Sequence, residues 1–545
     1  MVPARLIPAA PFLPGLALGA LCFCAALTPS LVPRGGLLQG ALAGLGFAAG
    51  YGVAVAGGML WRWLGFGMPQ RHRGLALAVL AAALGAMLWS LGRAARGQEA
   101  LHQAMGLPPV ETVRPITIAL TALLVAGVLI LLGRLLGHVV QAVARRLSAA
   151  LPPRVALIGG VLVALVGVEM LGNQLLLRQA LGAFDASYRR LDAAFPEEDG
   201  APPQDPLKTG SAASLLRWED LGAEGRNRIA DPLDAQGIAA IAGAPAQEPL
   251  RIYVGLGSAE TPQERARLAL QEAIRVGAFA RATLVIATPT GTGWVDPAAM
   301  FPLEALSRGD VATISVQYSY LPSWLSLLTV PEYGQETARA VFSAIHGYWR
   351  SLPRDQRPKL YLFGLSLGAL NSDLSADFYD LVGAPYQGAF WVGPPFGSRS
   401  WRHITDARNP GSPEWLPEFR DGSVVRFLNQ SGLPDGAPWG PLRIVYLQYA
   451  SDPITFFAPS ILWRQPDWMR APQGPGVAAE LRWLPLVSFL QIGFDVLTAT
   501  TTPQGHGHVY AGRDYLNGWL ALLSPEGWDA PALERLRAAM ASRGL

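Results

Sequence analysis

One serine lies in a pattern that turns a hydroxyl group into a nucleophile. Positions 364–368 read Gly-Leu-Ser-Leu-Gly, with Ser366 at the centre. An apolar run at 359–363 precedes the pattern, and a stretch of helical character follows it. Glycine is needed on both sides of the serine because side chains there would collide in the strained strand-to-helix turn. The sequence therefore predicts a nucleophile elbow, in which the Ser366 hydroxyl projects above the edge of the sheet.

Two histidines are candidates for the base that such a serine needs. In this arrangement the chain order is serine, then an acid, then histidine. Of seven histidines, only His506 and His508 lie in a late loop that precedes a helix, predicted at 514–523. Either one fits, and His508 is favoured because it lies nearer the helix. The alternatives are an ordinary surface loop and a metal pair. A metal pair lacks a third or fourth ligand at a recognisable spacing, so no metal is expected.

The carboxylate that would orient the histidine is predicted to be Asp452. It follows a predicted strand at 443–449 in the sequence Ala-Ser-Asp-Pro, where the proline fixes the turn. Asp467 and Asp495 are poorer candidates, the second because it lies inside an apolar helical run.

Backbone amides are expected to bind the negative charge that develops during acyl transfer. One is the amide of Leu367, directly after the serine. The other would come from the loop at 288–294, where glycines allow close approach and threonines offer hydroxyls; the candidates are Thr290, Gly291 and Thr292. An ordinary strand-to-helix turn is the alternative. The second glycine loop, at 255–258, lacks the spacing of a dinucleotide-binding loop and is expected to be a turn.

The elements that position these residues alternate between short β-rich runs and helical segments from residue 250 onward. This alternation is typical of an α/β domain, with a mostly parallel sheet and helices on both faces. The predicted strands are Leu250–Gly255, Thr283–Thr288, Ala312–Gln317, Lys359–Phe363, Ala389–Val392 and Arg443–Tyr449, and the helices between them include Pro262–Val276 and Tyr333–Trp349.

The first third of the chain has the composition of a membrane protein. The whole chain is 51% apolar and 15% charged, with a mean hydropathy of +0.26. Residues 1–176 carry a net charge of +9 against −6 for the remainder. Five apolar runs near membrane-spanning length, bounded by arginines, are predicted to form a transmembrane bundle; they lie at about 11–32, 37–60, 74–92, 115–133 and 155–173.

Arginine counts in the short loops favour a cytoplasmic N-terminus, eight against four. The first run is interpreted as an uncleaved helix because no cleavage site is evident. Five spans would then place the catalytic part on the extracytoplasmic side of the membrane. The predicted domains are a membrane domain at 1–176, a linker and pre-domain segment at 177–249, and an α/β domain at 250–545.

The partners expected are the lipid bilayer and an apolar ester or acyl substrate. Nucleic acid is not expected, since the basic charge lies in an apolar region, and no cofactor loop is found. Two aromatic-rich stretches either line an apolar pocket, contact the membrane surface or, more simply, pack in the core; they comprise Tyr318, Tyr320, Trp324, Phe456, Phe457, Trp463 and Trp468.

Taken together, these motifs resemble a family of bacterial membrane proteins with an N-terminal multi-helix region and a C-terminal α/β-hydrolase domain. The resemblance spans nearly the whole chain and rests on four segments: Trp-Glu-Asp-Leu-Gly at 218–222 with Gly-Arg at 225–226, the loop at 289–294, the elbow, and Gly-His-Gly-His at 505–508. It implies a Ser-His-Asp hydrolase of the lipase or esterase kind, and no particular substrate.

The residues thus favour hydrolysis of an acyl ester at a membrane surface. An acyltransferase would use the same residues with an alcohol in place of water. A non-catalytic membrane scaffold or transport accessory with a retired hydrolase domain is the alternative from another class, and the retention of all three triad residue types in order argues against it.

Overall fold

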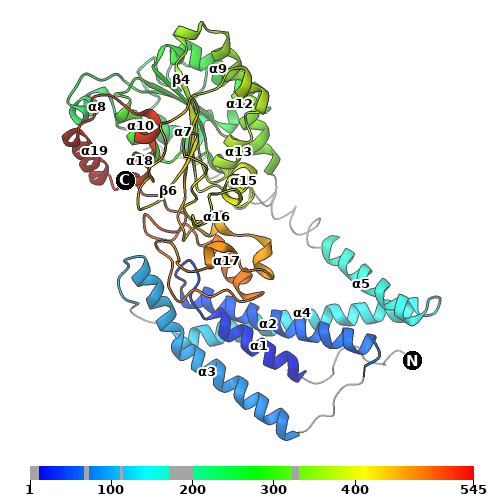
Figure 1. The fold of residues 1–545 in the computed structure, drawn as a ribbon. Helices are drawn as coiled ribbons and strands as arrows, with labels where there is room; N and C mark the ends of the chain where they lie inside the picture. Colours follow the sequence, from blue (N-terminus) through cyan, green and yellow to red (C-terminus); the bar gives the residue numbers. More distant parts are fainter. Residues whose placement is uncertain (1–11, 67–72, 111–113, 171–200, 322–330) are drawn as a thin grey trace. The chain divides into compact units, whose positions relative to one another are not determined.

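The computed structural model describes residues 12–66, 73–110, 114–170, 201–321 and 331–545, and the chain divides into two compact units (Figure 1). The helical unit comprises Met1–Gly182 and Phe457–Thr498. The sheet unit comprises Ala183–Phe456 and Ala499–Leu545. The second unit is therefore interrupted by a segment that folds with the first.

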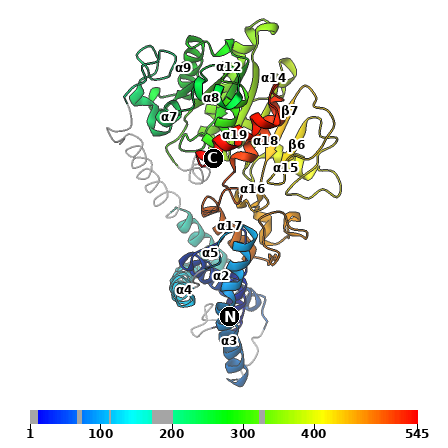
Figure 2. The same ribbon diagram turned by 90° about the vertical axis from the view of Figure 1, so that its left-hand side faces the viewer.

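The sheet unit is built on seven parallel strands in the order β1-β3-β2-β4-β5-β7-β6. This confirms the predicted α/β class with a parallel sheet. The predicted strands agree with the observed ones to within two residues, and the sequence did not indicate β6, a short edge strand (Figure 2). The strands are β1 Leu250–Val254, β2 Thr283–Thr288, β3 Val311–Val316, β4 Lys359–Leu365, β5 Gly388–Val392, β6 Val425–Leu428 and β7 Arg443–Leu447.

Helices cover both faces of the sheet, which is why the central strands are buried along nearly their whole length (Figure 1). One face carries α9 Pro262–Arg275, α12 Pro331–Ser351 and α13 Leu367–Asp373, and the other carries α8 Ala235–Ala242, α10 Pro297–Leu306, α18 Gly512–Leu523 and α19 Ala530–Ser542. The short helices α14 Phe378–Gly383, α15 Arg399–Asp406 and α16 Pro453–Phe456 follow β4, β5 and β7.

The strand order reverses direction between β2 and β4. From β2 the chain proceeds outward to β3, whereas from β4 it proceeds the other way to β5. In open parallel sheets the crevice at the carboxyl ends of the strands at such a reversal is the usual ligand site. The elbow serine follows β4, and the 288–294 loop follows β2, so the topology brings both to this point.

Part of the predicted linker is folded onto the sheet unit. Residues 218–221 form a 3₁₀ turn, η2, and Gly222–Ile229 form α7. Gly225 packs against the Tyr253 ring so closely that a Cβ there would lie 2.5 Å from it. The buried carboxylate of Glu304 on α10 pairs with Arg228 of α7 and with Arg251 of β1, at 2.6 Å from Arg251 Nη2. This ion cluster fastens α7 to the sheet.

Removing the charge of Glu304 should destabilise the sheet unit strongly. Burial alone would raise the pKa of Glu304, but pairing with Arg228 and Arg251 outweighs burial and lowers the pKa to about 2. Glu304→Gln leaves two buried guanidinium groups without their counter-ion, which costs about 3–5 kcal/mol. Urea unfolding of the detergent-solubilised protein, followed by tryptophan fluorescence, measures the loss.

The stabilisation that Glu304 contributes should decrease as the pH falls. Because the folded-state pKa is depressed, the wild-type contribution is fully present above the ordinary value of 4.5 and is lost as the pH falls toward about 2. The gap between wild type and Glu304→Gln should therefore shrink between about pH 5 and about pH 2. Glu534→Gln, which removes an exposed surface partner of Arg537, is the control and should change stability by less than about 1 kcal/mol. An equal loss in both variants would contradict the prediction.

The five apolar runs all form helices in the helical unit: α1 Leu13–Ala26, α2 Gly36–Trp63, α3 Arg73–Ala104, α4 Pro115–Leu147 and α5 Pro153–Glu169. Among the described residues, α2, α3 and α4 are long and apolar enough to cross a membrane. The prediction of five spanning helices is supported by length and composition for these three. In the described part of the chain α1 has 14 residues and α5 has 17, and their crossing of the membrane stays a prediction. Many leucines on α3 and α4 are exposed, as expected of lipid-facing helices.

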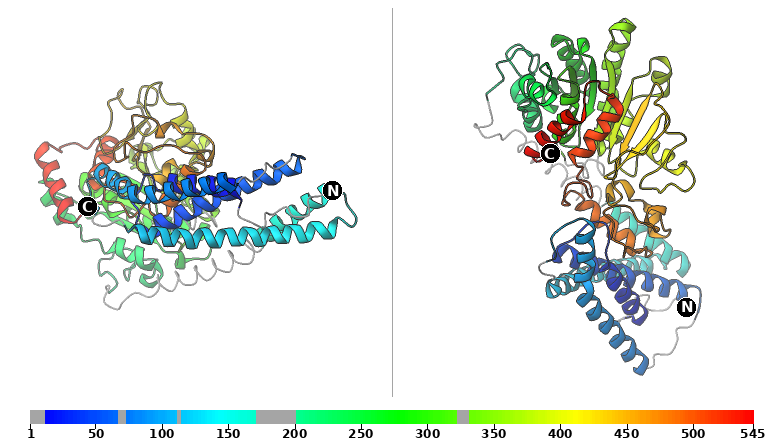
Figure 3. Two further views of the ribbon diagram at one scale, coloured as in Figure 1. Left: turned by 90° about the horizontal axis from the view of Figure 1, so that it is seen from below. Right: turned by 60° about the vertical axis from the view of Figure 1, so that its left-hand side comes forward.

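Glycines allow α2 and α4 to pack backbone to backbone, side by side (Figure 3). A Cβ at Gly40 would lie 2.7 Å from the Ile118 carbonyl oxygen, and one at Gly44 would lie 2.6 Å from that of Ala122. Small residues take this role in membranes because close van der Waals packing replaces the hydrophobic drive between helices. The contacts advance along both helices together, so α2 and α4 run parallel and begin at the same end of the bundle.

The segment Phe457–Thr498 packs with the helical unit although the sequence analysis placed it within the α/β domain. It contains η6 Pro459–Leu462, η7 Asp467–Met469 and α17 Val487–Leu497. The carboxylate of Asp495 accepts hydrogen bonds from Ser30 Oγ at 3.0 Å and from the Leu31 amide at 2.9 Å, and it pairs with Arg34. Gln491 donates to the Thr28 carbonyl. These contacts explain the carboxylate inside an apolar run: Asp495 holds the loop between α1 and α2.

Candidate active site

Ser366 adopts the strained conformation predicted for the elbow. It follows β4 with φ 57° and ψ −125°, a backbone region that non-glycine residues rarely occupy and that costs about 1–3 kcal/mol. Glycine is required on both sides, because a Cβ at Gly364 would overlap the Gly368 backbone and one at Gly368 would overlap the Thr288 carbonyl oxygen. The Ser366 amide donates to the Val392 carbonyl at 2.8 Å, which fixes the turn to β5.

His508 and Asp452 form a buried hydrogen-bonded pair. Nδ1 of His508 lies 2.7 Å from Oδ2 of Asp452, and the Asp452 side chain is fully buried. Because a carboxylate accepts, Nδ1 carries the proton and Nε2 is left as the basic nitrogen. Nε2 is buried and has no hydrogen-bond partner in the described part of the chain.

Three further donors hold the Asp452 carboxylate. Tyr510 donates its hydroxyl to Oδ2 at 2.7 Å, Thr455 donates to Oδ2 at 3.2 Å, and the Ile454 amide donates to Oδ1 at 2.8 Å. The carboxylate is therefore fixed in position next to the His508 ring.

Gly393 brings the His508 ring to the elbow. It follows Val392, the residue that accepts the Ser366 amide, and a Cβ at Gly393 would lie 2.6 Å from Cε1 of His508. The backbone of the loop that carries His508 is also fixed. The His508 amide donates to the Ala499 carbonyl at 2.9 Å, and the Gly507 amide donates to Ser451 Oγ at 2.9 Å. The structure thus gathers the serine, the histidine and the aspartate around the ends of β4, β5 and β7.

His506, two residues before His508 in the same loop, is held through its backbone. Its carbonyl accepts the Thr502 hydroxyl at 2.7 Å, and its backbone forms a bridge with Val509. Burial and the nearby charge of Arg513 lower the pKa of His506. Of the two histidines left open by the sequence, His508 is the one that contacts Asp452.

The loop predicted to bind the oxyanion lies directly against the elbow, since the Thr288 and Pro289 carbonyls contact Gly368. The loop is a closed turn: the Thr290 amide donates to the Trp294 carbonyl at 2.9 Å, and the Gly293 amide donates to the Thr290 carbonyl at 3.0 Å. The Thr290 amide is therefore already engaged, which leaves its buried hydroxyl as that residue's donor.

The other predicted donors lie in the same region. Gly291 is buried within the turn, and Thr292 is half-buried. Leu367, at the start of α13, is buried beside the serine. The structure therefore brings the elbow and the whole 290–292 segment to one place.

Two side chains that the sequence did not indicate hold this loop in place. Tyr253 donates its hydroxyl to the Gly293 carbonyl at 2.8 Å. Gln317 donates to the Thr292 carbonyl at 2.9 Å and accepts from the Leu256 amide at 3.0 Å. Tyr253 lies in β1 and Gln317 directly follows β3, and nothing in a single sequence connects these strands to the loop after β2.

The aromatic stretches divide between core and surface. Tyr318, Phe456 and Trp468 are buried, whereas Trp463 is 66% exposed. Trp463 and Trp468 belong to the helical unit. The remaining members are Tyr320 and Phe457, which are half-buried, and Trp324, which lies outside the described residues.

In the described ranges, no group of three or more histidine, cysteine, aspartate or glutamate side chains is arranged to hold a metal ion.

Comparison with known proteins gives matches to both parts of the chain. A family model described as the alpha/beta-hydrolase family matches residues 250–536, and one described as the N-terminus of that family matches residues 27–232. No curated protein and no solved structure matches the chain.

Proposed function

Because the chain belongs to the alpha/beta-hydrolase family, we propose that it is a membrane-bound serine hydrolase that cleaves an acyl ester. The observation that carries the proposal is the geometry of His508: Nδ1 is bonded to a buried carboxylate, and Nε2 has no partner among the described residues, on a ring packed against Gly393 beside the strained serine. Two of these features, the backbone strain and the buried unpaired nitrogen, reduce the stability of the fold. A catalytic role for Ser366 and His508 explains why both are present.

The proposed reaction has two steps. Ser366 Oγ attacks the ester carbonyl while Nε2 of His508 takes the hydroxyl proton, and Asp452 stabilises the imidazolium that forms. The tetrahedral oxyanion is bound by the Leu367 amide, with the Thr290 hydroxyl as a second donor. The His508 proton then passes to the leaving alcohol, and water, activated by the same nitrogen, releases the acid and restores Ser366.

The three long apolar helices are compatible with membrane insertion, and this supports a substrate that partitions into or near lipid. We place the reaction at a membrane surface on this ground, with an apolar acyl group as the part that the enzyme recognises. The charge distribution of the loops supports an extracytoplasmic location for the sheet unit.

A fluorophosphonate tests the proposal directly, because it phosphonylates only a serine that a neighbouring base activates. The detergent-solubilised full-length protein should be labelled on Ser366, as identified by peptide mass spectrometry, and an ester substrate should compete with the label. The absence of labelling in folded protein, or labelling at another serine, would contradict the proposed mechanism and favour a non-catalytic role for the fold.

A further inference from the structure

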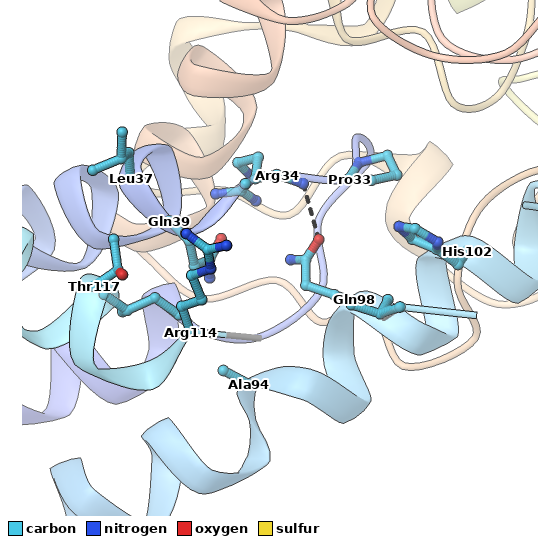
Figure 4. A pocket seen from close by; sticks show the side chains of 13 residues that line it. Pro33, Arg34, Leu37, Gln39, Ala94, Gln98, His102, Arg114 and Thr117 are labelled. Carbon is cyan, nitrogen blue, oxygen red and sulfur yellow. Dashed lines mark hydrogen bonds between the residues drawn. The ribbon is translucent and has the colours of Figure 1, made fainter. Parts of the chain in front are cut away.

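A second site lies in the helical unit and contains no residue of the proposed triad. It is a cavity of about 470 Å³ at the beginning of α2 and α4, and polar side chains line it although the helices around it are apolar (Figure 4). The polar lining side chains used below are Arg34, Gln98, Arg114 and Thr117. A cavity of this size accommodates a small ligand.

Two helix N-termini meet at this cavity. Because α2 and α4 run parallel and in contact, both helices begin at the cavity. Their first turns line it with Gly36 and Leu37 from α2 and with Thr117 and Ile118 from α4. Neither helix has a side-chain cap from the described residues. The first turn of a helix leaves its amide groups without partners inside the helix. Two adjacent positive dipole ends repel each other, and an anion between them would relieve the repulsion.

Buried side chains add donors that lack a partner in the described part of the chain. Gln98 accepts the Arg34 amide through Oε1 at 2.9 Å, and its Nε2 is buried and unpaired there. Nη1 of Arg34 is likewise buried and has no hydrogen-bond partner among the described residues. Both residues are only 6% exposed. Figure 4 shows the Gln98 amide nitrogen turned toward the part of the cavity where the Arg114 guanidinium lies. Gln39 also lines the cavity, and its Oε1 is a buried acceptor without a partner in the described residues. Because buried donors are normally paired and the unpaired donors outnumber this one acceptor, the lining lacks an acceptor.

Among the residues that the structure describes, the charged side chains that line the cavity are basic. Arg34 is compensated by Asp495, whose Oδ1 lies 3.2 Å from Arg34 Nε, whereas Arg114 brings a second guanidinium to the cavity edge. None of the lining residues in the described ranges is acidic. The nearby carboxylate of Glu99 accepts from the Val110 amide at 3.0 Å and from Gln103 at 3.2 Å. The acceptor that fits is therefore an anion.

We propose that this cavity binds a phosphate group. A phosphate presents several oxygens in different directions, and the donors here come from two helix ends, one amide side chain and one or two guanidinium groups, which a single planar carboxylate could not satisfy together. The ends of membrane helices lie at the level of lipid headgroups, so a phospholipid headgroup is one source and free inorganic phosphate is the other. The proposal is independent of the chemistry at Ser366.

The test is isothermal titration calorimetry on the full-length Ser366→Ala variant in a neutral detergent, because the lipid probes are themselves esters and the proposed hydrolysis would otherwise contribute heat. The probes are dihexanoyl phosphatidic acid, inorganic phosphate and dihexanoylglycerol, which has the same chains and no phosphate. Phosphatidic acid should bind saturably. Arg114→Gln should weaken that binding at least about tenfold, because it removes a charge-assisted contact. Arg145→Gln, at the other end of α4 and also exposed, is the matched control and should change affinity by less than about twofold.

A second variant separates loss of binding from loss of folding. Thr117→Glu places a carboxylate in the first turn of α4, where negative charge stabilises the helix, and it should abolish binding while the thermal unfolding temperature is kept or raised. Inorganic phosphate binding as tightly as the lipid would identify free phosphate as the ligand, and binding at least about tenfold weaker would identify the lipid headgroup. No saturable binding of either, equal binding of dihexanoylglycerol, or unchanged binding in both variants would overturn the proposal.

Discussion

Ser366→Ala should reduce ester turnover by roughly 10³–10⁶-fold while leaving the protein folded. The hydroxyl is the atom that forms the covalent intermediate, and nothing else in the proposed mechanism can replace it. The backbone conformation is set by glycines at 364 and 368 and by the hydrogen bond from the residue 366 amide to the Val392 carbonyl, all of which the alanine keeps. Hydrolysis of a chromogenic short-chain ester by the detergent-solubilised protein measures the loss, and tryptophan fluorescence checks the fold.

Ser375→Ala is the matched control. Ser375 lies just beyond the end of α13 and is buried like Ser366, but its hydroxyl donates to the local Ser372 carbonyl at 2.7 Å. Because that bond belongs to the helix end, the variant should lose at most about 1 kcal/mol of stability and keep its turnover. Turnover retained in Ser366→Ala would remove the proposed mechanism as a whole.

His508→Ala should lower turnover by roughly 10⁴–10⁶-fold, whereas His506→Ala should lower it by less than about tenfold. Both histidines have a buried ring nitrogen without a partner among the described residues, but only the His508 ring is hydrogen-bonded to Asp452, which leaves Nε2 as the base. The His506 backbone is held by Thr502 and Val509. Steady-state hydrolysis of the same ester, with both variants prepared in parallel, measures the difference. His506→Ala also serves as the control for disturbing the loop.

Added imidazole provides a further check on the role of His508. It should restore part of the activity of His508→Ala, because a free base can enter the space that the side chain leaves, and it should restore none to Ser366→Ala. A larger loss in His506→Ala than in His508→Ala would reverse the assignment of the base.

The sequence was sufficient for the parts of the fold that depend on local pattern. The strands that precede Ser366 and Asp452 are apolar runs, and their position in a parallel sheet follows from alternation with helices. The edge strand β6 was not indicated because four residues, one of them Arg426, give too short a pattern. Chain order and loop position were enough to propose Asp452 and His508 together.

What the sequence could not provide was contact between distant segments. Gln317 and Tyr253 hold the loop after β2 from two other strands, and their types are common in any sheet. Asp495 looked out of place in an apolar helix because its partners, Ser30 and Arg34, lie at the other end of the chain. Side-chain partners of this kind depend on tertiary packing and leave no local signal.

The partnership of Asp495 with the loop between α1 and α2 has a consequence for how the protein is made. Ser30 and Asp495 are 465 residues apart. At about 5–20 residues per second of synthesis, roughly 20 to 90 s pass between the appearance of Arg34 and that of its carboxylate. During this interval the helices can enter the membrane, but a guanidinium that will be buried lacks its counter-ion. The helical unit can therefore form its contacts with Asp495 only after most of the sheet unit has left the ribosome. The part of the chain that is synthesised first is thus among the last to finish folding.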